Sequence, residues 1–134
     1  FECIKDKTGS QRLVAFGRYA GIAGAFDFLR GCGEFMLEKG YQTPLIHLGS
    51  AYMYEDFNAM KESLAKIASQ IAKRGIAKEL TPLVFAVTGT GRVASGILDV
   101  LELLPHLKID PDDLKNYFES DLVDNKKIII SQFK

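Results

Sequence analysis

The chain has 134 residues, and its 17 lysine and arginine residues balance its 17 aspartate and glutamate residues. Without net charge it lacks the broad electrostatic attraction on which nucleic-acid and membrane-surface binding depends, which argues against both classes of function. Hydrophobic residues make up 47% of the chain, as in globular proteins, and no apolar run approaches the roughly 20 residues that a membrane-spanning helix needs.

The cysteine and histidine residues argue against a disulfide scaffold and against a metal site. Cys3 and Cys32 are far apart, and His47 and His106 belong to no metal-binding pattern such as H-E-x-x-H. Free cysteines fit a reducing compartment, which we expect to be the mitochondrial matrix or the cytoplasm. The chain opens at Phe1, without Met and without a targeting segment, so we expect it to be a piece of a longer polypeptide or a processed chain.

The first part of the chain predicts a hairpin followed by a helix. Residues 1–5 alternate like a strand, residues 7–10 have turn chemistry, and residues 13–16 form a compact apolar run. Apolar residues at helical spacing predict a helix over 22–36, with Gly40 as its C-terminal stop. Three glycines lie inside this helix: Gly24, Gly31 and Gly33. Since each costs up to about 1 kcal/mol relative to alanine, they suggest the close approach of another backbone.

A mixed loop or strand and a second helix come next. Residues 45–54 are rich in glycine, serine and aromatic residues, which fits either a loop or a strand. From about Asp56, apolar residues mark one face of an amphipathic helix that we expect to stop at Gly75. The Thr81-Pro82 pair follows, and we place a domain boundary between residues 80 and 81.

The rest of the chain predicts the order β-α-β-α-β. The apolar run at 83–88 is typical of a strand covered on both faces, and the helix after it is expected to last until Pro105. We expect a second strand at 107–109, a third helix opening at 110–113, and a third strand at 127–131. This order indicates an α/β fold, with half of a doubly wound, Rossmann-like parallel sheet.

A glycine-rich turn joins the first of these strands to its helix. The sequence GTGRVA at 89–94 has the G-x-G-x-x-A pattern. Gly89 permits the tight turn, Gly91 leaves room for a pyrophosphate against the backbone, and Ala94 lets helix and strand pack closely. The free amides of the helix N-terminus would then face the anion. In this context the pattern indicates dinucleotide binding, and the alternative is a tight turn without a ligand.

Asp110 has two interpretations. It follows Gly89 by about 20 positions, at the end of the second strand, where an acid commonly accepts hydrogen bonds from the ribose hydroxyls and favours NAD over NADP. Equally, Asp110 followed by Pro111 has the pattern of a helix N-cap. Arg92 likewise either contacts a phosphate from the glycine turn or lies in solvent.

Six short motifs carry a resemblance to a known family. They are RLVAFG at 12–17, YAGIAG at 19–24, GYQTP at 40–44, YMY at 52–54, PLVF at 82–85 and TGTG at 88–91. In this order they resemble the lysine–ketoglutarate reductase part of the bifunctional aminoadipic semialdehyde synthases. That family is similar in fold to alanine dehydrogenase and transhydrogenase, whose substrate and nucleotide domains face each other across a cleft. The resemblance implies that residues 1–80 are the C-terminal part of the substrate domain with its connecting helix, and residues 81–134 the N-terminal half of the dinucleotide-binding domain.

The resemblance also implies an activity, the reductive condensation of lysine with 2-oxoglutarate to saccharopine, with NAD or NADP as cofactor. Such chemistry needs a general acid/base near neutral pH, and the family's catalytic Lys/His pair lies upstream of RLVAFG, so no residue here matches it. We therefore expect no turnover by this chain alone. Substrate contacts are implied for Phe16 and Arg12, although the family often has a basic pair where this chain has Gln11-Arg12. The cofactor contacts are expected from Gly89, Thr90, Gly91, Arg92, Val93 and Asp110.

Two functions from different classes stay open. The chain is either a segment of an oxidoreductase of lysine degradation, or a shortened, inactive relative that serves as a structural or interaction subunit. Another member of the alanine dehydrogenase-like group fits the YAGIAG motif less well. In every case we expect the remainder of its own polypeptide or an assembly partner to cover the incomplete sheet. The apolar residues 128–130 are expected to form an exposed strand edge that pairs with other chains.

Overall fold

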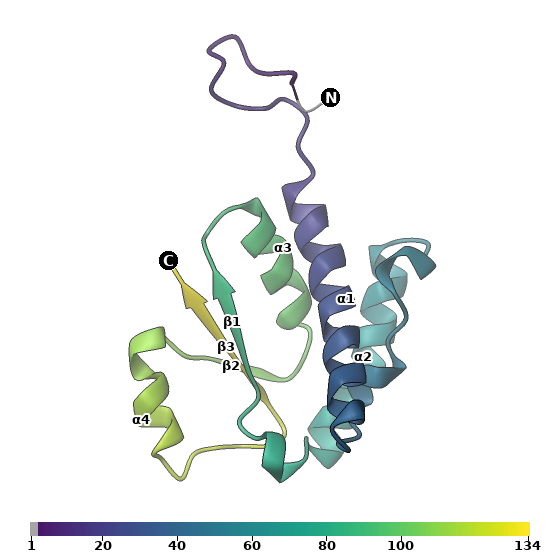
Figure 1. Cartoon of the computed structure of the whole chain (residues 1–134), viewed down its shortest axis with the longest axis vertical. Coiled ribbons are helices and arrows are strands. Elements are labelled where there is room, and N and C mark those ends of the chain that lie inside the picture. Colours follow the sequence, from purple (N-terminus) through teal and green to yellow (C-terminus); the bar gives the residue numbers. More distant parts are fainter. Residues whose placement is uncertain (1–2) are drawn as a thin grey trace.

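A computed structural model describes residues 3–134, so Phe1 and Glu2, and with them the start of the expected first strand, lie outside the described residues. The remaining residues before the first helix form an arm that projects from the body of the molecule (Figure 1). Lys5 and Arg12 form one antiparallel bridge, and the Leu13 N–H donates to the Ile4 carbonyl at 2.9 Å. Among the described residues, the expected hairpin is confirmed in a minimal form, with a single bridge and no regular strand before the first helix.

Helix α1 spans Gly17–Glu38 and begins earlier than its apolar spacing predicts. It is followed by Gly40, whose φ of 89° ends the helix as expected. Two short 3-10 helices, Pro44–His47 and Ala51–Met53, follow it, so the strand alternative for this stretch is wrong.

Helix α2 spans Phe57–Arg74, as its apolar spacing predicts. The Asp56 carboxylate accepts a hydrogen bond from the Ala59 N–H at 2.9 Å, which caps the first turn. Gly75, with φ of 73°, ends the helix. Within residues 3–134, no helix combines the length and the apolar character that crossing a membrane requires.

The second half of the chain forms a parallel sheet of three strands, β1 Val84–Thr88, β2 His106–Lys108 and β3 Ile128–Phe133. Helix α3, Arg92–Leu101, connects β1 to β2, and a 3-10 turn with the short helix α4, Leu114–Phe118, connects β2 to β3. The expected α/β class and the order β-α-β-α-β are confirmed. The spatial order is β1-β3-β2, whereas the usual mononucleotide-binding half has the order 3-2-1.

The position of β3 overturns one expectation. Ile128, Ile129 and Ile130 are no more than 2% exposed, because β3 inserts between β1 and β2 and is hydrogen-bonded on both sides. The prediction that they form an exposed edge was therefore wrong. The open edges belong to β1 and β2. The expectation that this first strand is covered on both faces was also wrong, since Phe85 is buried on one face of β1 and Ala86 is exposed on the other.

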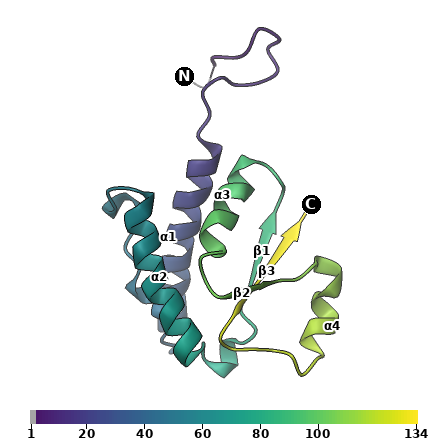
Figure 2. The same cartoon turned by 180° about the vertical axis from the view of Figure 1, so that it is seen from behind.

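One continuous core joins the two halves of the chain. Phe26 and Leu29 of α1, Leu64 and Ile71 of α2, and Ile130 of β3 all belong to it and are each at most 2% exposed. Helix α1 lies beside β1, and α4 lies beyond β3 on the opposite side of the sheet, in both Figure 1 and Figure 2. The division of the chain after residue 80 stays a prediction.

Two glycines bring α1 and α3 into backbone contact. A Cβ at Gly21 would overlap the Val93 carbonyl oxygen, and a Cβ at Gly96 would overlap the Arg18 carbonyl oxygen. An ion pair between Arg18 Nε and Asp99 Oδ2, at 2.7 Å, bridges the same two helices. The contact fixes α3, and the glycine turn before it, against the N-terminal half of α1.

The glycines that the sequence singled out inside α1 differ in their surroundings. Gly33 lies against the backbone of Ile46, as expected of a close approach. At Gly24 and Gly31 a Cβ would meet nothing within 4 Å among the described residues. The expected close approach of another backbone is therefore wrong for these two glycines.

We expect Gly96→Ala to lower the free energy of unfolding by about 1–3 kcal/mol, because its methyl group has to displace the α1 backbone. The matched control is Gly31→Ala, where the methyl group meets open space and helix propensity should raise stability by about 0.5–1 kcal/mol. Urea unfolding of both variants measures the difference. Equal effects of the two substitutions would contradict a close contact between α1 and α3.

Candidate functional site

A groove of about 750 Å³ lies between the end of the arm and the N-terminal end of α3. Its lining includes two residues expected to contact substrate and three expected to contact cofactor, together with the last residue of β1. These are Arg12, Phe16, Gly91, Arg92, Val93 and Thr88. The structure thus brings most of the predicted site residues to one place.

The glycine turn is attached to the end of the central strand. Gly89 has φ of 84°, a left-handed conformation that glycine adopts without strain. Its N–H donates to the Phe133 carbonyl, and its carbonyl accepts from Gln132 Nε2, both at 2.8 Å. Gln132 was not foreseen as part of the site, because no sequence signal shows that β3 lies next to β1.

The N-terminus of α3 is open to a ligand. Gly91 is its N-cap, with φ of −78° and no side-chain cap, and a Cβ there would meet nothing within 4 Å among residues 3–134. The first amides of a helix have no carbonyl partners and carry a partial positive charge, so they favour anions. Ala94, only 4% exposed, packs into the core as the motif requires of its small residue. Thr90 is exposed on the same turn.

Two guanidinium groups and two apolar side chains complete the groove. Arg12 comes from the arm and Arg92 from the first turn of α3, and neither has an ion-pair partner in the part of the chain that the structure describes. Phe16 and Val93 are 68% and 49% exposed, so their apolar surfaces are available to a ligand. The groove therefore suits a ligand with both anionic groups and a flat or apolar part.

Asp110 is not part of this groove. It follows β2, and β3 separates β2 from the glycine turn. Its carboxylate accepts a hydrogen bond from the Asp112 N–H at 3.1 Å and so caps the short 3-10 turn at Pro111–Asp113. With Lys108 and Lys134 it lines a smaller hollow of about 220 Å³ at the ends of β2 and β3. The capping interaction that its sequence pattern indicated is present, whereas its contact with a ribose stays a prediction.

Other reactive side chains lie away from the groove. Burial raises the pKa of the Cys32 thiol, which is half-buried in α1. His106 Nδ1 lies 2.8 Å from the Leu104 carbonyl oxygen, a local structural contact. In residues 3–134, no three histidine, cysteine, aspartate or glutamate side chains are close enough to hold a metal ion.

The two glycines of the turn should respond differently to alanine. Gly89→Ala is expected to cost about 1–2 kcal/mol of stability, because an L-residue is strained at positive φ. Gly91→Ala should leave stability unchanged or raise it by up to about 1 kcal/mol, since its φ suits any residue and the space is open. Thermal unfolding compares them, and a Gly91→Ala protein that unfolds as easily as Gly89→Ala would contradict the geometry of the turn.

Comparison with known proteins gives relatives for most of the chain. It is similar to the alpha-aminoadipic semialdehyde synthase of Arabidopsis thaliana, with 43% identity over 121 residues, which are 90% of this chain and 11% of the relative. It is also similar to the mitochondrial alpha-aminoadipic semialdehyde synthases of Rattus norvegicus and Mus musculus, each with 36% identity over 86% of this chain and 12% of the relative. The chain spans about a tenth of the length of these curated relatives. No family model matches it.

Proposed function

The chain is a homologue of one segment of the alpha-aminoadipic semialdehyde synthases, and on this basis we propose that it is the dinucleotide-binding segment of an oxidoreductase of lysine degradation. The observation that carries the proposal is the open N-terminus of α3 behind the turn at Gly89 and Gly91. This geometry leaves helix amides and space for a pyrophosphate at the same point.

Different residues of the groove would bind different parts of the ligand. The α3 amides and Arg92 would hold the pyrophosphate, because a guanidinium pairs well with phosphate oxygens. Val93 and Phe16 would pack against the flat part of the cofactor or the aliphatic part of a substrate. A nicotinamide bound here would supply the hydride that reduces the imine between the lysine side-chain amine and 2-oxoglutarate. Arg12 would bind a substrate carboxylate from the arm.

Both NAD and NADP are compatible with this proposal. A carboxylate at Asp110 would repel the 2′-phosphate of NADP if the adenosine ribose reaches the end of β2. Lys108 and Lys134 line the same hollow and would offset that repulsion. Titration with each cofactor separates the two cases.

The general acid/base that transfers the proton would lie outside this segment. The charged side chains in the groove are Arg12 and Arg92, and arginine keeps its proton near neutral pH. The acid/base for saccharopine formation would therefore belong to another part of the polypeptide. The same observation is compatible with the second candidate function, a catalytically inactive subunit that keeps the fold and contributes an interaction surface. The rat and mouse relatives are named mitochondrial, which supports the mitochondrial matrix as the proposed compartment.

Calorimetric titration with NADH and NADPH tests dinucleotide binding. We expect Gly91→Ala to weaken binding about tenfold or more, a loss of about 1.4 kcal/mol, because its methyl group occupies the space of the pyrophosphate. Gly31→Ala is the matched control and should bind as the wild type does. Unchanged affinity of a folded Gly91→Ala protein would show that the motif is only a tight turn and would favour the inactive-subunit function.

A further inference from the structure

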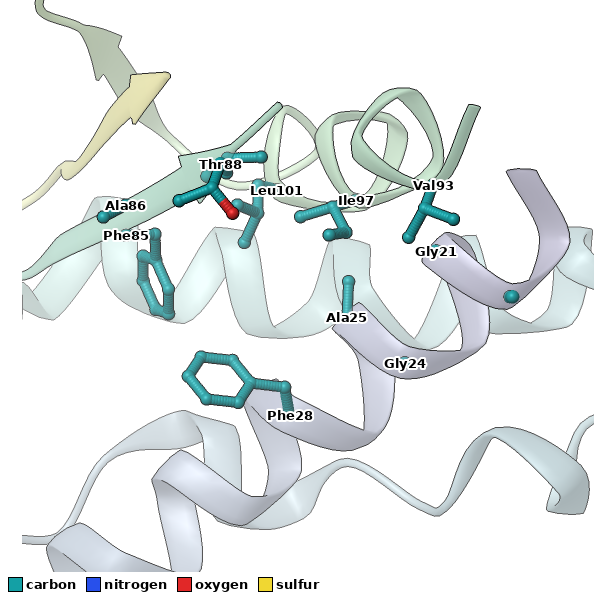
Figure 3. Close-up of a pocket in the computed structure, with 12 residues that line it drawn as sticks. Gly21, Gly24, Ala25, Phe28, Phe85, Ala86, Thr88, Val93, Ile97 and Leu101 are labelled. Atoms are coloured by element: carbon teal, nitrogen blue, oxygen red, sulfur yellow. The ribbon is translucent and has the colours of Figure 1, made fainter. Parts of the chain in front are cut away.

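Two further hollows differ in the chemistry of their walls. The first, of about 360 Å³ between α1, β1 and α3, is lined mainly by apolar side chains, such as Phe28 and Phe85 in Figure 3. The second, of about 250 Å³, lies between residues 42–47 and the C-terminal end of α2. We call it the α2 pocket, and its polar side chains are Gln42, Thr43, His47, Gln70 and Arg74. A charged ligand therefore suits the α2 pocket and not the first hollow.

Thr43 brings a buried hydroxyl to the α2 pocket. The residue is only 3% exposed, and its Oγ1 has no hydrogen-bond partner in the part of the chain that the structure describes. Thr43 precedes the 3-10 helix Pro44–His47, yet its side chain does not cap that helix. A buried polar atom without a partner costs roughly 1–3 kcal/mol. A ligand that offers the hydroxyl an acceptor would remove this cost.

The other polar side chains of the α2 pocket are also free to bind a ligand. Within residues 3–134, no side-chain hydrogen bond and no ion pair involves Gln42, His47, Gln70 or Arg74. All four are exposed. The described lining includes no carboxylate, so nothing in the α2 pocket neutralises the guanidinium of Arg74. The unpaired positive charge and the free donors favour an anionic ligand.

The end of α2 determines which anion fits best. Gly75, the C-cap of this helix, borders the α2 pocket. The last carbonyls of a helix lack N–H partners and carry about half a negative charge, so they repel an acceptor but take a hydrogen bond from a donor. An ionised carboxylate only accepts hydrogen bonds. Inorganic phosphate near neutral pH keeps a P–OH group, which donates to such a carbonyl while the other oxygens accept.

We propose that the α2 pocket is a binding site for inorganic phosphate, separate from the glycine turn. Arg74 supplies the positive charge and pairs with two phosphate oxygens, as a guanidinium does. The Thr43 hydroxyl donates from the buried side, and His47 and the two glutamine amides donate from the rim. The bound ion joins residues 42–47 to the end of α2, and so stabilises the contact between them. This site does not depend on the proposed function.

A titration of the ¹⁵N-labelled chain with inorganic phosphate, at constant ionic strength and with NADH present at saturation, tests the site. We expect the amides of Thr43, His47 and Gly75 to shift. Arg74→Gln should bind about tenfold more weakly or worse, because it removes the paired charge. Lys73→Gln is the matched control, since it removes the same charge from the neighbouring position of α2, which does not line the pocket, and it should bind as the wild type does.

Thr43→Val tests the buried hydroxyl with a side chain of nearly the same shape. We expect about fivefold weaker phosphate binding, because one hydrogen bond to the ion is lost. Without phosphate the variant should be as stable as the wild type or more stable, since it removes a buried hydroxyl that has no partner. Thermal unfolding with and without phosphate measures both effects, so loss of binding cannot be confused with loss of folding.

Four results would overturn the proposal. They are equal shifts on adding sodium chloride, phosphate shifts confined to the glycine turn, equal binding by Arg74→Gln and Lys73→Gln, and unchanged binding by Thr43→Val. Glycerol phosphate, a phosphate ester, is titrated in parallel, and tighter binding of the ester would overturn the assignment to inorganic phosphate. NADH binding is read at the glycine turn, so failure of the α2 pocket and failure of the proposed function can be observed separately.

Discussion

Backbone contact between α1 and α3 at Gly21 and Gly96 holds the two halves of this chain together. Because neither helix carries a side chain at the contact, the helices approach until carbonyl oxygens occupy the positions that Cβ atoms would take. The approach fixes the start of α3 against the start of α1, where the arm ends. The arm residues Arg12 and Phe16 and the glycine turn then border one groove. A wider spacing of the helices would separate the two sides of the candidate site.

The strand order determines the rest of the site. With β3 between β1 and β2, Gly89 is held by Phe133 and Gln132 at the end of β3, and Asp110 is placed beyond that strand. The same order buries the isoleucines of β3 and leaves β1 with an open edge. One topological feature thus positions the glycine turn and separates it from Asp110.

Local features of the fold could be predicted from the sequence because each depends on neighbouring residues. The cap at Asp56, the stop at Gly75 and the positive φ of Gly89 all follow from such local chemistry. The burial of 128–130 and the exclusion of Asp110 from the groove depend on which strands become neighbours, which spacing along the chain does not specify. Gly21 was missed for a similar reason, because only the packing of α3 shows which glycine of α1 meets another backbone.

The arm and the glycine turn form two walls of one candidate binding groove. An NMR titration of the ¹⁵N-labelled chain with NADH tests it most directly, because every amide reports separately. We expect the amides of Gly91, Arg92 and Val93 to shift together with those of Arg12, Phe16 and Gly17 on the opposite wall. Shifts confined to the turn, or centred on α2, would contradict it.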